Sequence, residues 1–115
     1  MIVRDLMEPL RLMIAAGESG VDRSVTGGYV GDLLSCVMAG AAQGSIWVTV
    51  QGHPNVVAVA SLVGISGIIV TEGARIEAST LEKANQEGIP ILTAQRASFD
   101  VVAELAQLGI KGKPC

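Results

Sequence analysis

A short polar run in the middle of the chain offers the best set of groups for chemistry: Gln51-Gly52-His53-Pro54-Asn55. It lies between an apolar run typical of a buried strand and a helical stretch, and ligands of open α/β sheets bind where strands end in this way. The side chains of Gln51, His53 and Asn55 combine hydrogen-bond donors and acceptors beside free helix amides. With Thr71 from the loop after the next strand, they predict a shallow polar ligand site. The alternative is that His53 and Asn55 only cap the helix.

Catalysis by His53 needs more than this run supplies. A general base requires an orienting carboxylate and a nucleophile within reach. Glu72, which follows the next predicted strand, could orient the imidazole ring. The candidate nucleophiles Ser35, Cys36 and Ser61, however, lie inside predicted helices and lack a nucleophile-elbow motif. One histidine without clustered carboxylates is also a poor set of metal ligands. We therefore expect no catalytic residue, no metal site and no cofactor.

A glycine pair, Gly27-Gly28, followed by Tyr29, is the second candidate for ligand binding. Two glycines allow backbone amides to approach a phosphate closely, and the following helix would point its positive end the same way. The alternative, which we favour, is a bulge or tight bend in a strand. The run 109–114 does not fit a phosphate-binding P-loop, because its glycine spacing is short and proline replaces the hydroxyl residue. We interpret it as a frayed basic tail.

A repeated strand–helix unit must position these groups. Apolar runs at 46–50, 67–70 and 89–92 are typical of strands, and each precedes a helical stretch, which indicates a parallel sheet. Pro90 favours an edge strand at 89–92, since proline cannot donate to the ladder. The sequence therefore predicts a single α/β domain, in which helices flank a mostly parallel sheet of four or five strands.

The remaining elements follow from apolar periodicity and capping residues. In the first third we expect a helix at 3–10, a strand at 12–15, an extended segment at 25–30 and a helix at 32–39. The core face of that second helix should comprise four residues: Leu33, Leu34, Val37 and Met38.

Capping residues mark the ends of the later helices. A capping-box pattern runs from Ser79 to Glu82, Gly88 is placed to end that helix, and Ser98 is placed to cap the last one.

The helical stretch 55–63 is apolar on every side, and such a helix is buried all round. A domain of this size has little room for a helix without a solvent face, so a second chain should cover it. We expect a homodimer whose interface includes Val56, Val57, Val59, Ala60 and Leu62. The alternative is that one long loop or a terminus of the same chain lies over the helix.

Composition excludes several function classes. The chain has 115 residues, of which 50% are apolar and 17% charged, and its net charge is −3. From Leu33 to Thr71 the chain has no Asp, Glu, Lys or Arg and a single histidine, His53, yet polar residues and glycines interrupt this segment, so we expect no membrane span, which needs about 20 apolar residues in a row. The acidic balance and the few aromatic residues argue against nucleic-acid binding. No signal peptide is visible and Cys36 and Cys115 make no disulfide framework, so we expect a cytoplasmic protein.

The stretch 21–35 resembles the DRTGG domain family. Asp22-Arg23 matches the first half of the name motif, and Thr26-Gly27-Gly28 matches the second half after a two-residue insertion. The segments 46–51 and 53–60 are also similar to stand-alone bacterial and archaeal members. The resemblance covers about residues 1–110 as one DRTGG domain and leaves 111–115 as a short C-terminal tail.

The resemblance implies regulation and not catalysis. DRTGG domains are similar to the N-terminal, non-kinase domain of HPr kinase/phosphorylase, and in their regulatory settings they dimerise and sense nucleotide-like ligands. We therefore expect a non-catalytic, ligand-sensing homodimer that binds an adenine-nucleotide-like molecule. The alternative is a protein-interaction subunit of a redox or hydrogenase-associated assembly, because stand-alone members are often encoded near such genes. That the protein is an enzyme is the hypothesis that we favour least.

Overall fold

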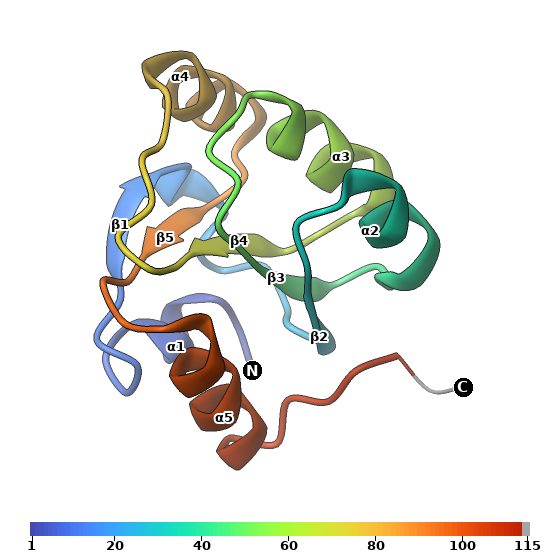
Figure 1. Ribbon diagram of the computed structural model, residues 1–115, viewed down its shortest axis with the longest axis vertical. Coiled ribbons are helices and arrows are strands. Elements are labelled where there is room, and N and C mark those ends of the chain that lie inside the picture. The colour runs from blue at the N-terminus through green and yellow to red at the C-terminus, as the bar shows by residue number, and fades with distance from the viewer. Residues whose placement is uncertain (114–115) are drawn as a thin grey trace.

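The computed structural model describes residues 1–113 and contains one five-stranded sheet with helices on both faces (Figure 1). The strands are β1 (Met13–Ala16), β2 (Gly27–Val30), β3 (Ser45–Thr49), β4 (Gly67–Val70) and β5 (Ile91–Thr93). The helices are α1 (Arg4–Met7), α2 (Leu34–Gly40), α3 (Asn55–Val63), α4 (Ala78–Glu87) and α5 (Ser98–Gln107), with a short 3₁₀ turn, η1 (Glu18–Gly20). The end of the predicted tail, Pro114 and Cys115, lies outside the described residues. Within residues 1–113, no helix combines the length and hydropathy that crossing a membrane requires.

The sheet has the order β1-β5-β4-β3-β2, and β2 to β5 are parallel. This confirms the predicted α/β fold with a mostly parallel sheet. The sheet is nevertheless mixed, because β1 pairs antiparallel with β5 and forms the edge of the sheet on that side. The edge position predicted for the strand at Pro90 is therefore wrong. Pro90 stands just before β5, where its missing N–H removes no ladder bond, and its carbonyl accepts a hydrogen bond from Ile68 N at 2.9 Å.

The connections explain which helices cover which face. From β2 to β5 every crossover advances by one strand in the same direction, and right-handed crossovers then place α2, α3 and α4 on one face. On that face the three helices pack on Trp47, Ile68, Val70 and Ile91. The opposite face, which carries Ile46, Val48, Ile69 and Leu92, packs on α1 and α5 (Figure 1). The middle strands are buried on both faces, which is why they are apolar throughout.

Helix α3 has the predicted bounds but a different environment. Four of the five residues expected at a dimer interface, Val56, Val57, Val59 and Ala60, are buried in the chain's own core. The helix reaches solvent along a face that contains Ala58, Ser61 and Leu62, so it is not buried on every side. Of the five expected interface residues, only Leu62, which is 76% exposed, is open to a second chain.

Two local predictions are corrected in α2 and α4. Helix α2 begins at Leu34, and of its four expected core residues only Val37 is fully buried, whereas Leu33 and Met38 are exposed. Helix α4 begins at Ala78 after the extended residue Glu77, so Ser79 lies inside the first turn and makes no capping bond.

The two other capping residues have different outcomes. Gly88 ends α4 in the left-handed conformation, as predicted. Ser98 is the first residue of α5 and not its cap.

Candidate functional site

The polar run after β3 lies at the carboxyl edge of the sheet, and Asp32 organises it. The Asp32 carboxylate accepts hydrogen bonds from Thr49 Oγ1 at 2.9 Å and from Val50 N at 3.0 Å. Gln51 Nε2 donates to the Asp32 carbonyl at 3.2 Å. These bonds tie the loop after β2 to the loop after β3. Sequence reasoning overlooked Asp32, although it is the last charged residue before the uncharged segment.

Further along the same run, His53 and Gly52 are engaged by the chain itself. His53 Nδ1 accepts a hydrogen bond from the Asn55 amide at 3.1 Å, which is the capping role given above as the alternative. The Gly52 carbonyl accepts bonds from Thr80 Oγ1 at 2.6 Å and from Glu77 N at 3.1 Å. A Cβ at Gly52 would lie 2.0 Å from the Arg75 carbonyl oxygen, so only glycine fits this contact. Gln51, His53 and Asn55 remain exposed above this anchored backbone.

The loop after β4 belongs to α5 and not to the polar run. Thr71 is fully buried, and its Oγ1 lies 2.5 Å from Ser98 Oγ. The Glu72 carboxylate accepts a hydrogen bond from Ser98 N at 2.8 Å, so it caps α5 from outside the helix. Glu72 has a φ of +62°, a strained value for a non-glycine residue, and its amide is held by the Arg96 carbonyl at 2.9 Å. Glu72 is thus committed to α5, and a role in orienting His53 has no support.

This topology explains why the carboxyl edge is shallow. A ligand crevice forms where neighbouring loops leave a sheet toward opposite faces. Here that happens only between β4, which leads to α4, and β5, which leads to α5. Thr71, Glu72 and Ser98 fill this place with their own contacts. Among residues 1–113, no group of three or more potential ligands from His, Cys, Asp and Glu gathers to hold a metal.

An open cavity lies instead on the α5 face of the sheet. It has a volume of about 410 Å³ and runs between β2, α5 and the segment after α5; we call it the β2–α5 groove. Its walls are mostly apolar, and Lys111 is the one charged residue among them. The lining residues are Gly28, Tyr29, Val30, Val48, Val102, Leu105, Ala106, Ile110, Lys111 and Gly112.

The glycine pair makes the close packing beside this groove possible. Strand β2 keeps an unbroken parallel register with β3, so the bulge or bend expected at Gly27-Gly28 is wrong. Gly28 N donates to the Lys111 carbonyl at 2.9 Å, and a Cβ at Gly28 would lie 3.0 Å from Ile110 Cγ2. The tail is therefore docked on β2 as far as Lys111 and is not frayed there. The ring of Tyr29 packs toward Gly40, on the other face of the sheet.

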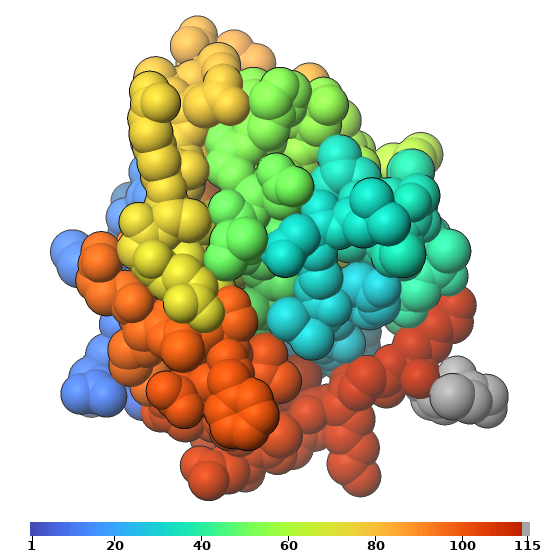
Figure 2. Space-filling model, in the orientation of Figure 1, coloured from blue at the N-terminus to red at the C-terminus, as the bar shows by residue number. Residues whose placement is uncertain are grey.

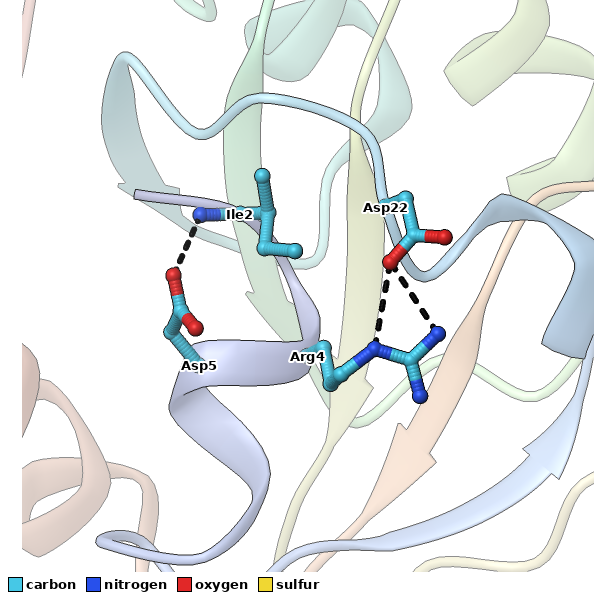
Figure 3. A network of polar contacts seen from close by, with 4 residues as sticks. All are labelled: Ile2, Arg4, Asp5 and Asp22. Carbon is cyan, nitrogen blue, oxygen red and sulfur yellow. Dashed lines mark hydrogen bonds and ion pairs between the residues drawn. The ribbon is translucent and has the colours of Figure 1, made fainter.

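The charged part of the motif has a structural role at the N-terminus. Arg4 donates to Asp22 Oδ1 from Nε at 3.1 Å and from Nη2 at 3.0 Å (Figure 3). Nearby, Asp5 Oδ2 accepts a bond from Ile2 N at 2.9 Å (Figure 3). Both partners of the ion pair are exposed, and such a pair stabilises by about 0–1 kcal/mol. Asp22 thus docks its loop on α1.

A second hollow, of about 470 Å³, adjoins the groove along α5. It is lined by Val30, Ser98, Phe99, Val102, Ala103 and Ala106, and it shares Val30, Val102 and Ala106 with the groove. Sequence reasoning missed Phe99, although Phe99, Val102, Ala103 and Ala106 recur at helical spacing and so form a stripe of their own.

Comparison with known proteins identifies a family and structural relatives. The model of the DRTGG domain matches residues 13–108. No curated protein matches the chain. Among solved structures, the chain is similar to the CBS and DRTGG domains of the regulatory region of Clostridium perfringens pyrophosphatase, complexed with its activator, diadenosine tetraphosphate. The TM-score is 0.73 at 17% identity, over 92% of this chain and 46% of that one, so the two share a fold and this chain spans about half of the regulatory region.

Proposed function

Because this chain belongs to the DRTGG domain family, we propose that it is a non-catalytic regulatory module that senses a small ligand and acts as a homodimer. One observation carries the ligand-sensing part: the β2–α5 groove is an open, mostly apolar cavity of about 410 Å³, within the size range of small-molecule sites. The glycine pair, the second candidate for ligand binding above, lies beside it, and Gly28 and Tyr29 are among the residues that line it.

The chemistry of the groove favours an adenine-nucleotide-like ligand. Val30, Val48 and Val102 provide apolar walls for a flat ring, and Gly112 has no side chain that would obstruct it. The exposed Lys111 offers a positive charge for a phosphate at one end. The relative from Clostridium perfringens binds diadenosine tetraphosphate in a regulatory region that includes this fold, which is consistent with the proposal.

A thermal-shift titration with AMP, ATP, diadenosine tetraphosphate and adenosine tests this site. We expect nucleotides to raise the melting temperature, and Lys111→Ala to weaken their binding roughly tenfold through loss of one charge-assisted contact while adenosine binding stays unchanged. The matched controls are His53→Ala and Asn55→Ala at the carboxyl edge. If these two variants abolish the shift and Lys111→Ala does not, the ligand binds at Gln51, His53 and Asn55. If no nucleotide shifts the melting temperature of the wild type, the ligand proposal is wrong.

A second candidate function is a protein-interaction subunit of a redox or hydrogenase-associated assembly. The observation that favours it is the exposed apolar side chain of Phe99, which protrudes from α5 with 83% of its surface exposed. Absence of any nucleotide shift, together with co-purification of a second protein that Phe99→Ala abolishes, would favour this function. In either case we place the protein in the cytoplasm, where the exposed free thiol of Cys36 would stay reduced.

A further inference from the structure

Helix α5 has two apolar faces, and the fold leaves one of them largely exposed. Val101 and Leu105 are buried against the sheet. A second stripe, Phe99, Val102, Ala103 and Ala106, follows the i, i+3, i+4, i+7 spacing of one helical face and lines the open hollow. Single exposed apolar residues are ordinary, whereas a contiguous apolar face around a hollow is typical of an interaction surface.

This surface has both a protrusion and a cavity that could receive it. We call it the α5 patch: Val30, Ser98, Phe99, Val102, Ala103 and Ala106. Phe99 protrudes with 83% of its surface exposed, and the small side chains of Ala103 and Ala106 leave the hollow of about 470 Å³ open. In Figure 2, α5 (orange to red) and the segment around the end of β2 (cyan) lie on the same face of the molecule. A surface that carries both shapes can be complementary to itself.

The charges around the patch also suit contact with an identical surface. A two-fold interface brings each residue near its axis close to its own copy, so charged residues there repel each other. None of the six patch residues is charged, although the chain as a whole carries a net charge of −3. The two charged residues of α5, Asp100 and Glu104, lie outside this stripe, and Glu104 is paired with Arg96. Pairing of two α5 helices through the stripe therefore places no charged residue of the patch against its own copy.

We propose that a second copy of this chain docks on the α5 patch. The two α5 helices pack antiparallel about an axis near Val102, and each Phe99 fills the hollow beside the partner's Ala106. This inference rests on the proposed homodimer and assigns its surface to α5 in place of α3. Leu62 on α3 is exposed to a similar degree, but its exposed neighbours Ala58 and Ser61 are small and add little apolar contact area.

The test compares two aspartate substitutions at similarly exposed positions on two helices, Phe99→Asp and Leu62→Asp. Sedimentation equilibrium gives the dimer dissociation constant, and circular dichroism with a thermal melt verifies that each variant is folded. We expect a wild-type dimer at micromolar concentration, at least about 100-fold weaker association in Phe99→Asp, and unchanged association in Leu62→Asp. Ala103→Gln, which places a larger side chain in the hollow, should weaken association as well.

The outcomes separate this inference from the proposed function. A monomeric wild type would overturn the homodimer and the α5 interface together, but leave the ligand proposal standing on its own titration. A wild-type dimer that persists in both Phe99→Asp and Ala103→Gln would overturn only the assignment to α5. Loss of the dimer in Leu62→Asp but not in Phe99→Asp would place the interface on α3.

Discussion

At the scale of single residues, several polar and glycine positions turn out to serve packing. His53 uses Nδ1 to hold the first amide of α3, and Gly28 has no Cβ because the segment at Ile110 lies against it. The capping role of His53 could be predicted, because a polar residue just before a helix commonly accepts from its amides. The role of Gly28 could not, since its neighbour is more than 80 positions away in the sequence and only the folded chain brings the two together.

Asp32 provides a prediction at this scale. In Asp32→Ala, the hydroxyl of the buried Thr49 and the amide of Val50 both lose their acceptor. We expect a loss of about 1–2 kcal/mol in the free energy of unfolding, measured by urea denaturation. The matched control is Asp22→Ala, another exposed aspartate, whose partner is the flexible side chain of Arg4; it should cost less than about 1 kcal/mol. Equal losses in the two variants would contradict the anchoring role of Asp32.

At the scale of elements, the strongest apolar patterns were predicted best. The bounds of β4 and α3 agree with the prediction, because a short apolar run between turn residues leaves little choice. Helix starts were predicted less well. Ser79 and Ser98 are both good capping residues, yet the caps are Glu77 and Ala97, with α5 capped by Glu72 from another loop. Such a cap depends on tertiary contact and leaves no local signature in the sequence.

This capping contact leads to the prediction for α5. In Glu72→Ala, the amide of Ser98 loses its charged acceptor at the positive end of the helix. We expect the free energy of unfolding to fall by about 1 kcal/mol, and the amides of the first turn of α5 to exchange faster in hydrogen-exchange measurements. Exchange in α3, which makes no bond to Glu72, should stay the same and serves as the internal control. A uniform increase over both helices would argue against a local cap.

At the scale of the whole molecule, the parallel sheet could be predicted from the repeated strand–helix unit. The places of strand β1 and helix α5 in the fold could not. The crossovers from β2 to β5 are constrained by their handedness, so their order could be expected. Strand β1 and helix α5 have no such constraint, because the first joins a free edge and the second ends the series. Strand β1 makes the sheet mixed. Helix α5 helps to cover the face opposite to α2, α3 and α4, where the open groove lies.

Both core clusters share the same strands, which predicts cooperative unfolding. Trp47 is fully buried on the face of α2, α3 and α4, and its neighbour Ile46 is buried on the face of α1 and α5. Neither cluster can persist without the sheet, so we expect a single transition in urea at constant protein concentration. Fluorescence of Trp47, the only tryptophan, and circular dichroism of the helices should give the same midpoint. Separate midpoints would indicate that the two faces unfold independently.

Val30, Val102 and Ala106 belong to two hollows at once, the β2–α5 groove and the α5 patch. A ligand in the groove and a second copy of the chain on the patch would each contact the same three side chains. Thermodynamic linkage then requires the influence to be mutual: whatever the ligand does to pairing, pairing does to ligand affinity by the same factor. Because pairing depends on how much of the chain is present, the abundance of the protein would itself set the ligand level at which it responds.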